Sequence, residues 1–229
     1  MKKIIVLVST LSVAISAIAQ VALDKPQIQG KGEVSESLAA VRLANYLVRY
    51  GYENESTISL INALQIFAEN PTQKLDAERE GTNVDVSVST GKGQKVSFDY
   101  ETVLSDARKF AEGDTNLLSL IDEIDAEAKG NTRGAVNGPS RTYEIVDGNS
   151  TDTYHISFIA GYIAEILVSG DGDTDLDLYV YDSNGNLIAS DSDYTDNCYV
   201  RWVPAWTGRY IVKVVNRGPV YNRYVLLTN

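Results

Sequence analysis

The stretch GDGDTDLDLYVYDSNGNL, from Gly170 to Leu187, decides the fold of the C-terminal half of the chain. Four aspartates recur at every second position and run directly into an apolar, aromatic segment. Successive side chains of a β-strand point to opposite faces, so we expect Leu176, Leu178 and Val180 to face a core. The opposite face then carries Asp175, Asp177, Tyr179 and Tyr181.

Short strand-like segments continue on both sides of this stretch. Turn residues separate them, as at Asp147-Gly148, Asn184-Gly185 and Thr207-Gly208. Eight such segments within about 90 residues predict an antiparallel β-sandwich or jelly roll. The eight segments are TYEIV, TYHISFIA, YIAEILVS, DLDLYVYD, NLIAS, CYVRWV, RYIVKVV and RYVLLT.

The order of these motifs in residues 140–229 resembles the bacterial pre-peptidase C-terminal domain family. DLDLYVYD (175–182) is similar to the family's central strand, NGNL (184–187) to its turn, and ASDS (189–192) to the step that follows. TGRYIVKV (207–214) and YVLL (224–227) are similar to its last strands. The resemblance implies a non-catalytic jelly-roll module of secreted hydrolases. Relatives are implicated in calcium-dependent stability and in binding extracellular polymers such as collagen.

The preceding half has a helical period and resembles no family that we recognise. Apolar residues recur at helical spacing in four segments, which predict two helical hairpins between residues 35 and 130. Gly51 is expected to end the first helix in a left-handed cap. Asn70-Pro71 should end the second, and Asp114 or Thr115 should cap the last. Residues 84–88 alternate Val with polar residues and predict a short β insertion.

The N-terminus has the pattern of a secretory signal peptide. Lys2 and Lys3 precede a short apolar run, and Ala17-Ile18-Ala19 predicts cleavage after Ala19. The expected organisation is therefore a signal peptide (1–19), an extended segment (20–34), a helical domain (35–130), a linker (131–140) and a β-sandwich (141–229). This is an α+β multidomain architecture, exported to the periplasm or beyond, with no membrane insertion of the mature chain.

The charge balance excludes some partners. The chain has 20 basic and 31 acidic residues, and loss of Lys2 and Lys3 leaves 18 against 31, a net charge of −13. Nucleic acids and anionic membranes select basic surfaces, so neither is an expected partner. Cation binding and solubility fit this balance better.

The alternating aspartates predict a calcium site. Like charges about 7 Å apart on one strand face repel, and a hard divalent cation relieves that repulsion with oxygen ligands. Three more aspartates in the next loop, Asp191, Asp193 and Asp196, can approach the same edge. The alternative is that Asp171 and Asp173 decorate a solvated turn, while Asp175 and Asp177 cap or pair with arginines such as Arg201 or Arg209. The candidate calcium ligands are Asp171, Asp173, Asp175, Asp177, Asp191 and Asp193.

Aromatic residues on the outward face suggest a binding platform for a polymer, since aromatic side chains are good anchors. The candidates are Tyr179, Tyr181, Tyr194, Trp202 and Trp206, although both tryptophans can equally pack the end of the sandwich. Catalytic machinery is not recognisable. The single His155 and the single Cys198 lie in separate strand segments, and a Ser-His-Asp triad or a zinc site would need more partners.

The sequence therefore predicts a secreted non-enzymatic protein whose β-sandwich binds an extracellular ligand or partner, with Ca²⁺ as the one expected cofactor. The alternative is an accessory subunit of a secreted or periplasmic complex, in which the helical domain docks on another protein. A third hypothesis is an enzyme of a type that the sequence does not reveal.

Overall fold

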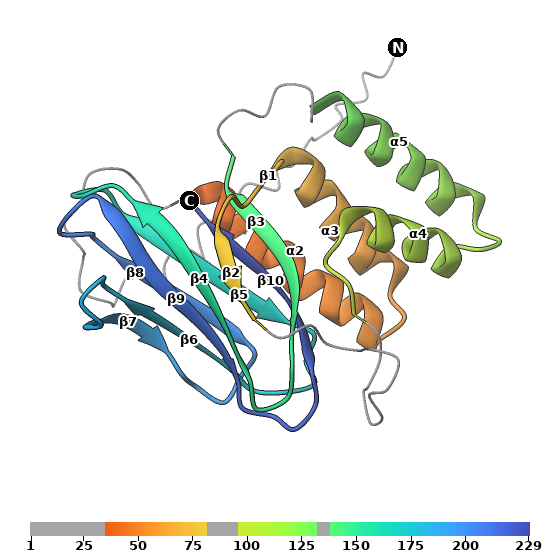
Figure 1. Cartoon of the computed structure of the whole chain (residues 1–229). Helices are drawn as coiled ribbons and strands as arrows, with labels where there is room; N and C mark the ends of the chain where they lie inside the picture. The colour runs from red at the N-terminus through yellow and green to blue at the C-terminus, as the bar shows by residue number, and fades with distance from the viewer. Residues whose placement is uncertain (1–34, 82–95, 132–137) are drawn as a thin grey trace, which may run out of the picture.

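The computed structural model describes residues 35–81, 96–131 and 138–229. The expected signal peptide, the segment 20–34, the insertion at 84–88 and most of the linker 131–140 lie outside these residues. Among the described residues, no helix combines the length and apolar character needed to cross a membrane. The described part is an α+β structure, with four helices beside two packed sheets (Figure 1).

The two sheets form the expected jelly roll. One sheet has the order β1-β3-β10-β5-β8 and the other the order β2-β4-β9-β6-β7. All neighbours pair antiparallel except β1 and β3, which are parallel. The eight predicted strands are β3 (Ser140–Val146), β4 (Thr151–Phe158), β5 (Ala164–Gly170), β6 (Leu176–Tyr181), β7 (Leu187–Asp191), β8 (Asn197–Trp202), β9 (Gly208–Asn216) and β10 (Asn222–Thr228).

Two further strands come from the half that was expected to be helical. β1 (Gln73–Lys74) adds to the edge of β3, and β2 (Glu78–Glu80) adds to the edge of β4. Between them, Leu75 and Ala77 pack against the sandwich core. Residues 73–80 therefore belong to the sandwich, which corrects the expectation that the helical domain takes in this whole part of the chain.

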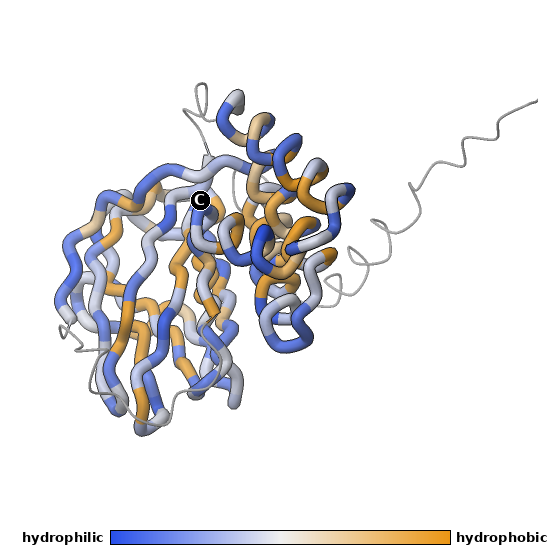
Figure 2. The backbone as a smooth tube through the Cα atoms, turned by 90° about the vertical axis from the view of Figure 1, so that its right-hand side faces the viewer, coloured by the Kyte–Doolittle hydropathy of each residue, from blue (hydrophilic) through white to orange (hydrophobic). Residues whose placement is uncertain are grey.

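β5 is buried along its whole length because both of its faces are covered. Ile166 and Val168 point into the sandwich core together with Leu178 and Val180 of β6. Leu167 points the other way, into the core of the helical layer. Figure 2 shows hydrophobic segments along both strands and helices, with hydrophilic turns between them.

The helices begin at side chains that accept hydrogen bonds from the first turn. They are α2 (Glu36–Glu53), α3 (Thr57–Glu69), α4 (Tyr100–Phe110) and α5 (Thr115–Asn131). Ser35, Ser56 and Asp99 cap the first three, and Asp114 Oδ1 accepts from the amides of Asn116 and Leu117 at the start of α5. Each such cap contributes about 1 kcal/mol.

The predicted cap at Gly51 is wrong, because α2 continues through this residue to Glu53. A Cβ atom at Gly51 would lie 2.4 Å from Leu60 Cδ2. The glycine therefore allows α3 to approach α2 closely, and its function is packing rather than helix termination.

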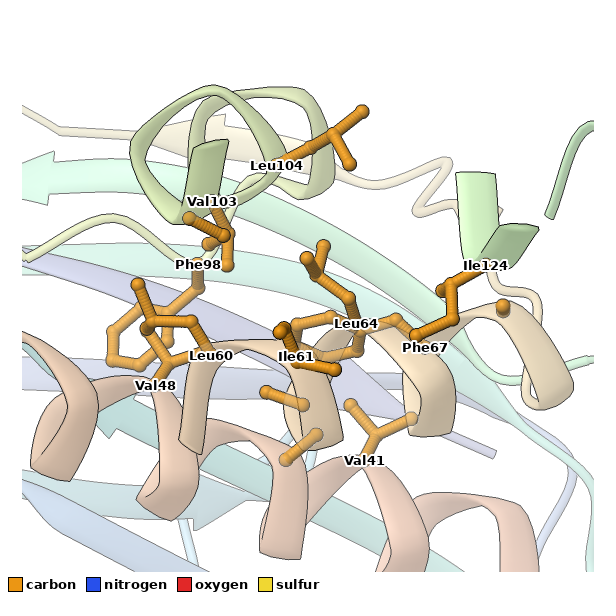
Figure 3. Packing of buried hydrophobic residues seen from close by; sticks show 14 of the residues in the cluster. Val41, Val48, Leu60, Ile61, Leu64, Phe67, Phe98, Val103, Leu104 and Ile124 are labelled. Carbon is orange, nitrogen blue, oxygen red and sulfur yellow. The ribbon is translucent and has the colours of Figure 1, made fainter. Parts of the chain in front are cut away.

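The helical layer and the sandwich share a continuous core. Leu60, Ile61 and Leu64 of α3 lie between α2 and α4, as Figure 3 shows. The same cluster extends to the outer face of the first sheet, where it includes Leu167, Val225 and Leu227. The helices thus bury a sheet face that would otherwise be apolar and exposed to water.

Candidate ligand-binding groove

An open groove separates the C-terminal half of α2 from two loops at one end of the sandwich. It has a volume of about 840 Å³. One wall is Tyr46 to Glu53 of α2. The other is formed by the β5–β6 loop at Gly172–Asp175, the β7–β8 loop at Tyr194–Asp196 and the first residue of β8, Asn197. We call this the α2–loop groove. Its size lies within the range of ligand-binding sites in proteins.

Three polar contacts fix α2 beside the sandwich and so position the groove. The Ser35 amide donates to Glu165 Oε2 at 2.7 Å, and Asn45 Nδ2 donates to Ser169 Oγ at 3.1 Å. Arg49 Nη1 lies 2.6 Å from Asp196 Oδ1. Asp196 is 3% exposed and also accepts from the Gly172 amide, so one carboxylate joins α2 to both loops. Charge-assisted bonds of this kind are stronger than neutral ones.

Among the candidate calcium ligands, the side chains of Asp171, Asp177, Asp191 and Asp193 accept hydrogen bonds from donors of this chain. Asp171 Oδ2 accepts from the Arg223 amide at 2.9 Å, and Asp191 Oδ2 accepts from the Tyr199 amide at 2.9 Å. Asp193 accepts from the amide and hydroxyl of Thr195 within a turn.

Asp177 Oδ2 lies 2.5 Å from Arg217 Nε and accepts from Tyr179 at 3.0 Å. The expected ion pairing is therefore present, but its arginine is neither Arg201 nor Arg209. Sequence reasoning had no means of finding Arg217, which follows the end of β9 and reaches back over β6.

Asp173 and Asp175 are the two candidates that line the groove. Asp175 Oδ1 is buried and has no hydrogen-bond partner among the described residues. Burial and the neighbouring carboxylates of Asp177 and Asp193 raise the pKa of Asp175 above its usual range, although Arg217 acts in the opposite direction. Its surroundings therefore favour the protonated form of the Asp175 carboxyl more than those of an exposed aspartate do.

The described residues hold no group of three or more His, Cys, Asp or Glu side chains arranged to bind a metal ion. The candidate ligands are spread over β6, two loops and the end of β7. Calcium binding by these aspartates stays a prediction of the sequence.

The five candidate aromatic residues do not form one platform. Tyr194 is 98% exposed and lines the groove. Tyr179 and Tyr181 lie side by side on β6, with ring centroids 6.4 Å apart. Trp206, in the β8–β9 loop, stacks on Tyr210 of β9. This loop follows the C-terminal end of β8, whereas the groove lies at the N-terminal end of that strand.

Trp202 corrects the expectation of an exposed position. It is buried in the sandwich core, with its ring centroid 4.7 Å from that of Phe158 in an edge-to-face arrangement. Its packing follows the alternative that the sequence left open.

The two residues that were weighed for catalysis lie in ordinary strand environments. His155 Nε2 is 3.6 Å from Glu80 Oε1, between β4 and β2. Cys198 is buried, and its thiol lies 3.0 Å from the Leu176 carbonyl oxygen. Burial raises the pKa of the Cys198 thiol well above its usual range, which disfavours the nucleophilic thiolate.

Tyr46 and Tyr50 are groove residues that sequence reasoning missed. Both are exposed although they lie on a helix that packs against the core. With Leu43 they follow an i, i+3, i+7 pattern, a second stripe beside the buried one. The helical spacing of these large side chains was visible in the sequence, but their exposure was not.

Comparisons with known proteins find similarity at the level of distant structure. The sequence matches no family model and no curated protein. Solved structures with a similar fold include the pre-peptidase C-terminal domain of a collagenase from Bacillus anthracis. It is 15% identical, covers 39% of this chain and 88% of that chain, and has a TM-score of 0.33.

Two other similar structures have different functions. The mitogen from Yersinia pseudotuberculosis is 10% identical, with 41% and 86% of the two chains covered and a TM-score of 0.34. A periplasmic inhibitor of g-type lysozyme from Aeromonas hydrophila is 14% identical, with 40% and 84% covered and a TM-score of 0.31. At this distance none of them assigns a function, so the resemblance of residues 140–229 to the pre-peptidase C-terminal family rests on the sequence motifs.

Proposed function

We propose that this chain is an exported, non-catalytic binding protein that holds its ligand in the α2–loop groove. The observation that carries the proposal is the concentration of exposed tyrosines there. Tyr46, Tyr50 and Tyr194 are 43%, 56% and 98% exposed and come from two separate elements. Tyrosine offers a large contact area with few rotatable bonds, which makes it effective in binding sites.

The rest of the groove supports the same reading. Its walls are joined by an ion pair between Arg49 and the buried carboxylate of Asp196, which holds the helix that carries Tyr46 and Tyr50 beside the loop that carries Tyr194. Thr195 and Asn197 also line the groove and add polar side chains to its wall. Ligand-binding sites typically combine a contact surface with a few fixed polar groups that orient the ligand.

A binding screen with groove variants tests the proposal. The probes are soluble collagen, neutral oligosaccharides of four or more sugars, and short basic and acidic peptides. We compare the wild type with Tyr50→Ala/Tyr194→Ala, and use Tyr162→Ala as a control because Tyr162 is 49% exposed and lies next to β5 at the end away from the groove.

At least one probe should bind the wild type and the control equally well. Its Kd should rise about tenfold or more in the double variant, which corresponds to about 1.4 kcal/mol. A screen in which no binding depends on the groove tyrosines would contradict the proposal.

A further inference from the structure

We propose that Arg42 of α2 and Arg201 of β8 form a binding site for an oxyanion, the carboxylate, sulfate or phosphate group of a ligand. The site adjoins the α2–loop groove but does not depend on the function proposed for that groove. Both walls of the groove continue to it. Arg42 lies one helical turn before the groove residue Tyr46. Arg201 lies on the same face of β8 as the groove residue Asn197.

Two tyrosine rings hold the Arg42 guanidinium in place. Its Cζ atom lies 5.3 Å from the ring centroid of Tyr199 and 5.9 Å from that of Tyr46. Stacking on a ring is favourable for a planar guanidinium and leaves the N–H groups at its rim able to donate in the plane. Arg42 Nε is buried and has no hydrogen-bond partner among the described residues. The side chain is therefore ordered before any ligand binds, while this donor lacks an acceptor.

Arg201 approaches the same tyrosine from β8. Tyr199 and Arg201 share the face of the strand that points away from the sandwich core, since Val200 between them is buried in that core. Burial and the hydrogen bond to Glu165 raise the pKa of the Tyr199 hydroxyl. Arg201 and Arg42 both act on this pKa in the opposite direction, so both positive charges lie near the hydroxyl.

The carboxylates beside Tyr199 are bonded to other donors. Glu165, which lies opposite Arg201 in the β5–β8 register, accepts from the Ser35 amide through Oε2. Its Oε1 accepts from the Tyr199 hydroxyl. Asp191 Oδ2 accepts from the Tyr199 amide at 2.9 Å. Within the part of the chain that the structure describes, neither of the two arginines forms an ion pair.

Arg49, two turns further along α2, shows the contrasting arrangement. Its guanidinium forms an ion pair with Asp196 at 2.6 Å. Arg42 and Arg201 are partly buried but lack such a partner, and together they offer two planar sets of N–H donors. Guanidinium groups bind carboxylate and phosphate oxygens in pairs, through charge-assisted hydrogen bonds. An oxyanion between them would satisfy donors that are partly shielded from water.

Isothermal titration of the whole chain at low ionic strength tests the site with inorganic phosphate, sulfate and succinate. Chloride at matched ionic strength is the reference, because it provides charge without the paired oxygens of the other anions. The variants are Arg42→Gln/Arg201→Gln and Arg201→Gln alone. The single variant keeps the stacked Arg42, so loss of binding there does not reflect altered packing of α2.

The control variant, Arg141→Gln/Arg223→Gln, removes the same charge from the same sheet. Both of these arginines also stack on tyrosines, with Cζ 4.9 Å from the ring centroid in each case. The β3–β10 register places Arg141 opposite Leu227 and Arg223 opposite Ile145. They are therefore about four residues, or about 14 Å, apart along the strands and cannot hold one small anion together.

At least one of the three oxyanions should bind the wild type and the control with similar Kd. Its Kd should rise about tenfold or more in Arg42→Gln/Arg201→Gln, and it should also rise in Arg201→Gln. Preference for succinate over phosphate and sulfate would identify a carboxylate ligand, and the reverse preference a phosphate or sulfate ester. Binding no stronger than that of chloride, or equal weakening in the control, would overturn the inference.

The outcome is separable from that of the groove. Tyr50→Ala/Tyr194→Ala should leave oxyanion binding unchanged, because Tyr50 lies one turn beyond Tyr46 on the side away from Arg42. If no oxyanion binds while a probe still depends on the groove tyrosines, only the oxyanion site is wrong. If an oxyanion binds and no probe depends on those tyrosines, only the groove proposal fails.

Discussion

Removal of the Arg79 side chain should destabilise the sandwich more than the loss of an exposed ion pair does. Arg79 of β2 donates to Asp152 Oδ2 from Nε at 3.2 Å and from Nη2 at 2.9 Å. Asp152 is 0% exposed, and its other side-chain hydrogen bond comes from the Tyr224 hydroxyl at 2.6 Å. In Arg79→Ala the buried carboxylate therefore keeps one donor and loses its counter-charge.

The size of the effect follows from the ways in which Asp152 can respond. Removing one partner of a buried ion pair typically costs about 3–5 kcal/mol. Protonation of the carboxyl limits this cost, because neutralising an ordinary aspartate at pH 7 takes about 4 kcal/mol. We therefore expect Arg79→Ala to lower the free energy of unfolding by about 3–4 kcal/mol. At pH 5 the limit falls to about 1.5 kcal/mol, so the deficit should shrink as the pH is lowered.

Urea unfolding followed by circular dichroism at pH 7 and pH 5 measures both quantities. The matched control is Arg209→Ala, because Arg209 also contacts β2, through Glu78 at 3.3 Å, but both side chains are at least 60% exposed. An exposed pair of this kind contributes about 1 kcal/mol or less. Arg79→Ala/Asp152→Asn should recover a large part of the loss. A deficit no greater than that of Arg209→Ala, or one independent of pH, would refute the reasoning.

Two further predictions concern aspartates. Asp182 accepts from Asn186 Nδ2 at 2.8 Å and from the amides of Asn184 and Asn186, and these bonds lower its pKa. The stabilisation by Asp182 should be complete above the unfolded-state pKa of about 3.9 and should be lost as the pH falls through the lower folded-state pKa. The deficit of Asp182→Asn in the free energy of unfolding, measured in urea, should therefore shrink between about pH 5 and pH 3. An equal deficit throughout this range would count against the prediction. Calcium binding predicts a higher thermal midpoint in millimolar Ca²⁺ than in EDTA, with the rise lost in Asp173→Asn/Asp175→Asn. Equal midpoints would rule it out for these residues.

The strands of the sandwich were predictable because their burial follows a period of two. β6 places Leu176, Leu178 and Val180 in the core, as its alternation requires. β1 and β2 were not predicted because they are only two and three residues long. A weak signal was present, since Leu75 and Ala77 alternate with charged residues on either side. Strands this short depend on neighbours that are distant in sequence.

The candidate site was only partly predictable, and the reason is long-range contact. Asp173, Asp175 and Tyr194 were chosen from the sequence and do line the groove. Asp177 was expected on the outer face of its strand, but Arg217 and Tyr179 cover it and leave it 4% exposed. No local pattern reports such coverage. The helical wall of the groove was missed for the same reason, because it depends on how α2 docks.

The docking of α2 links the stability of the fold to the proposed binding. Successive helix positions are about 100° apart, so Asn45 and Arg49 lie on one face while Tyr46 and Tyr50 lie on the next. The first face is bonded to Ser169 and Asp196 of the sandwich, and the second faces the groove. The same two turns of helix therefore anchor the layer and present the aromatic wall. A ligand that binds these tyrosines relies on contacts made by their immediate neighbours, so a sandwich without its helical layer would lack half of the site.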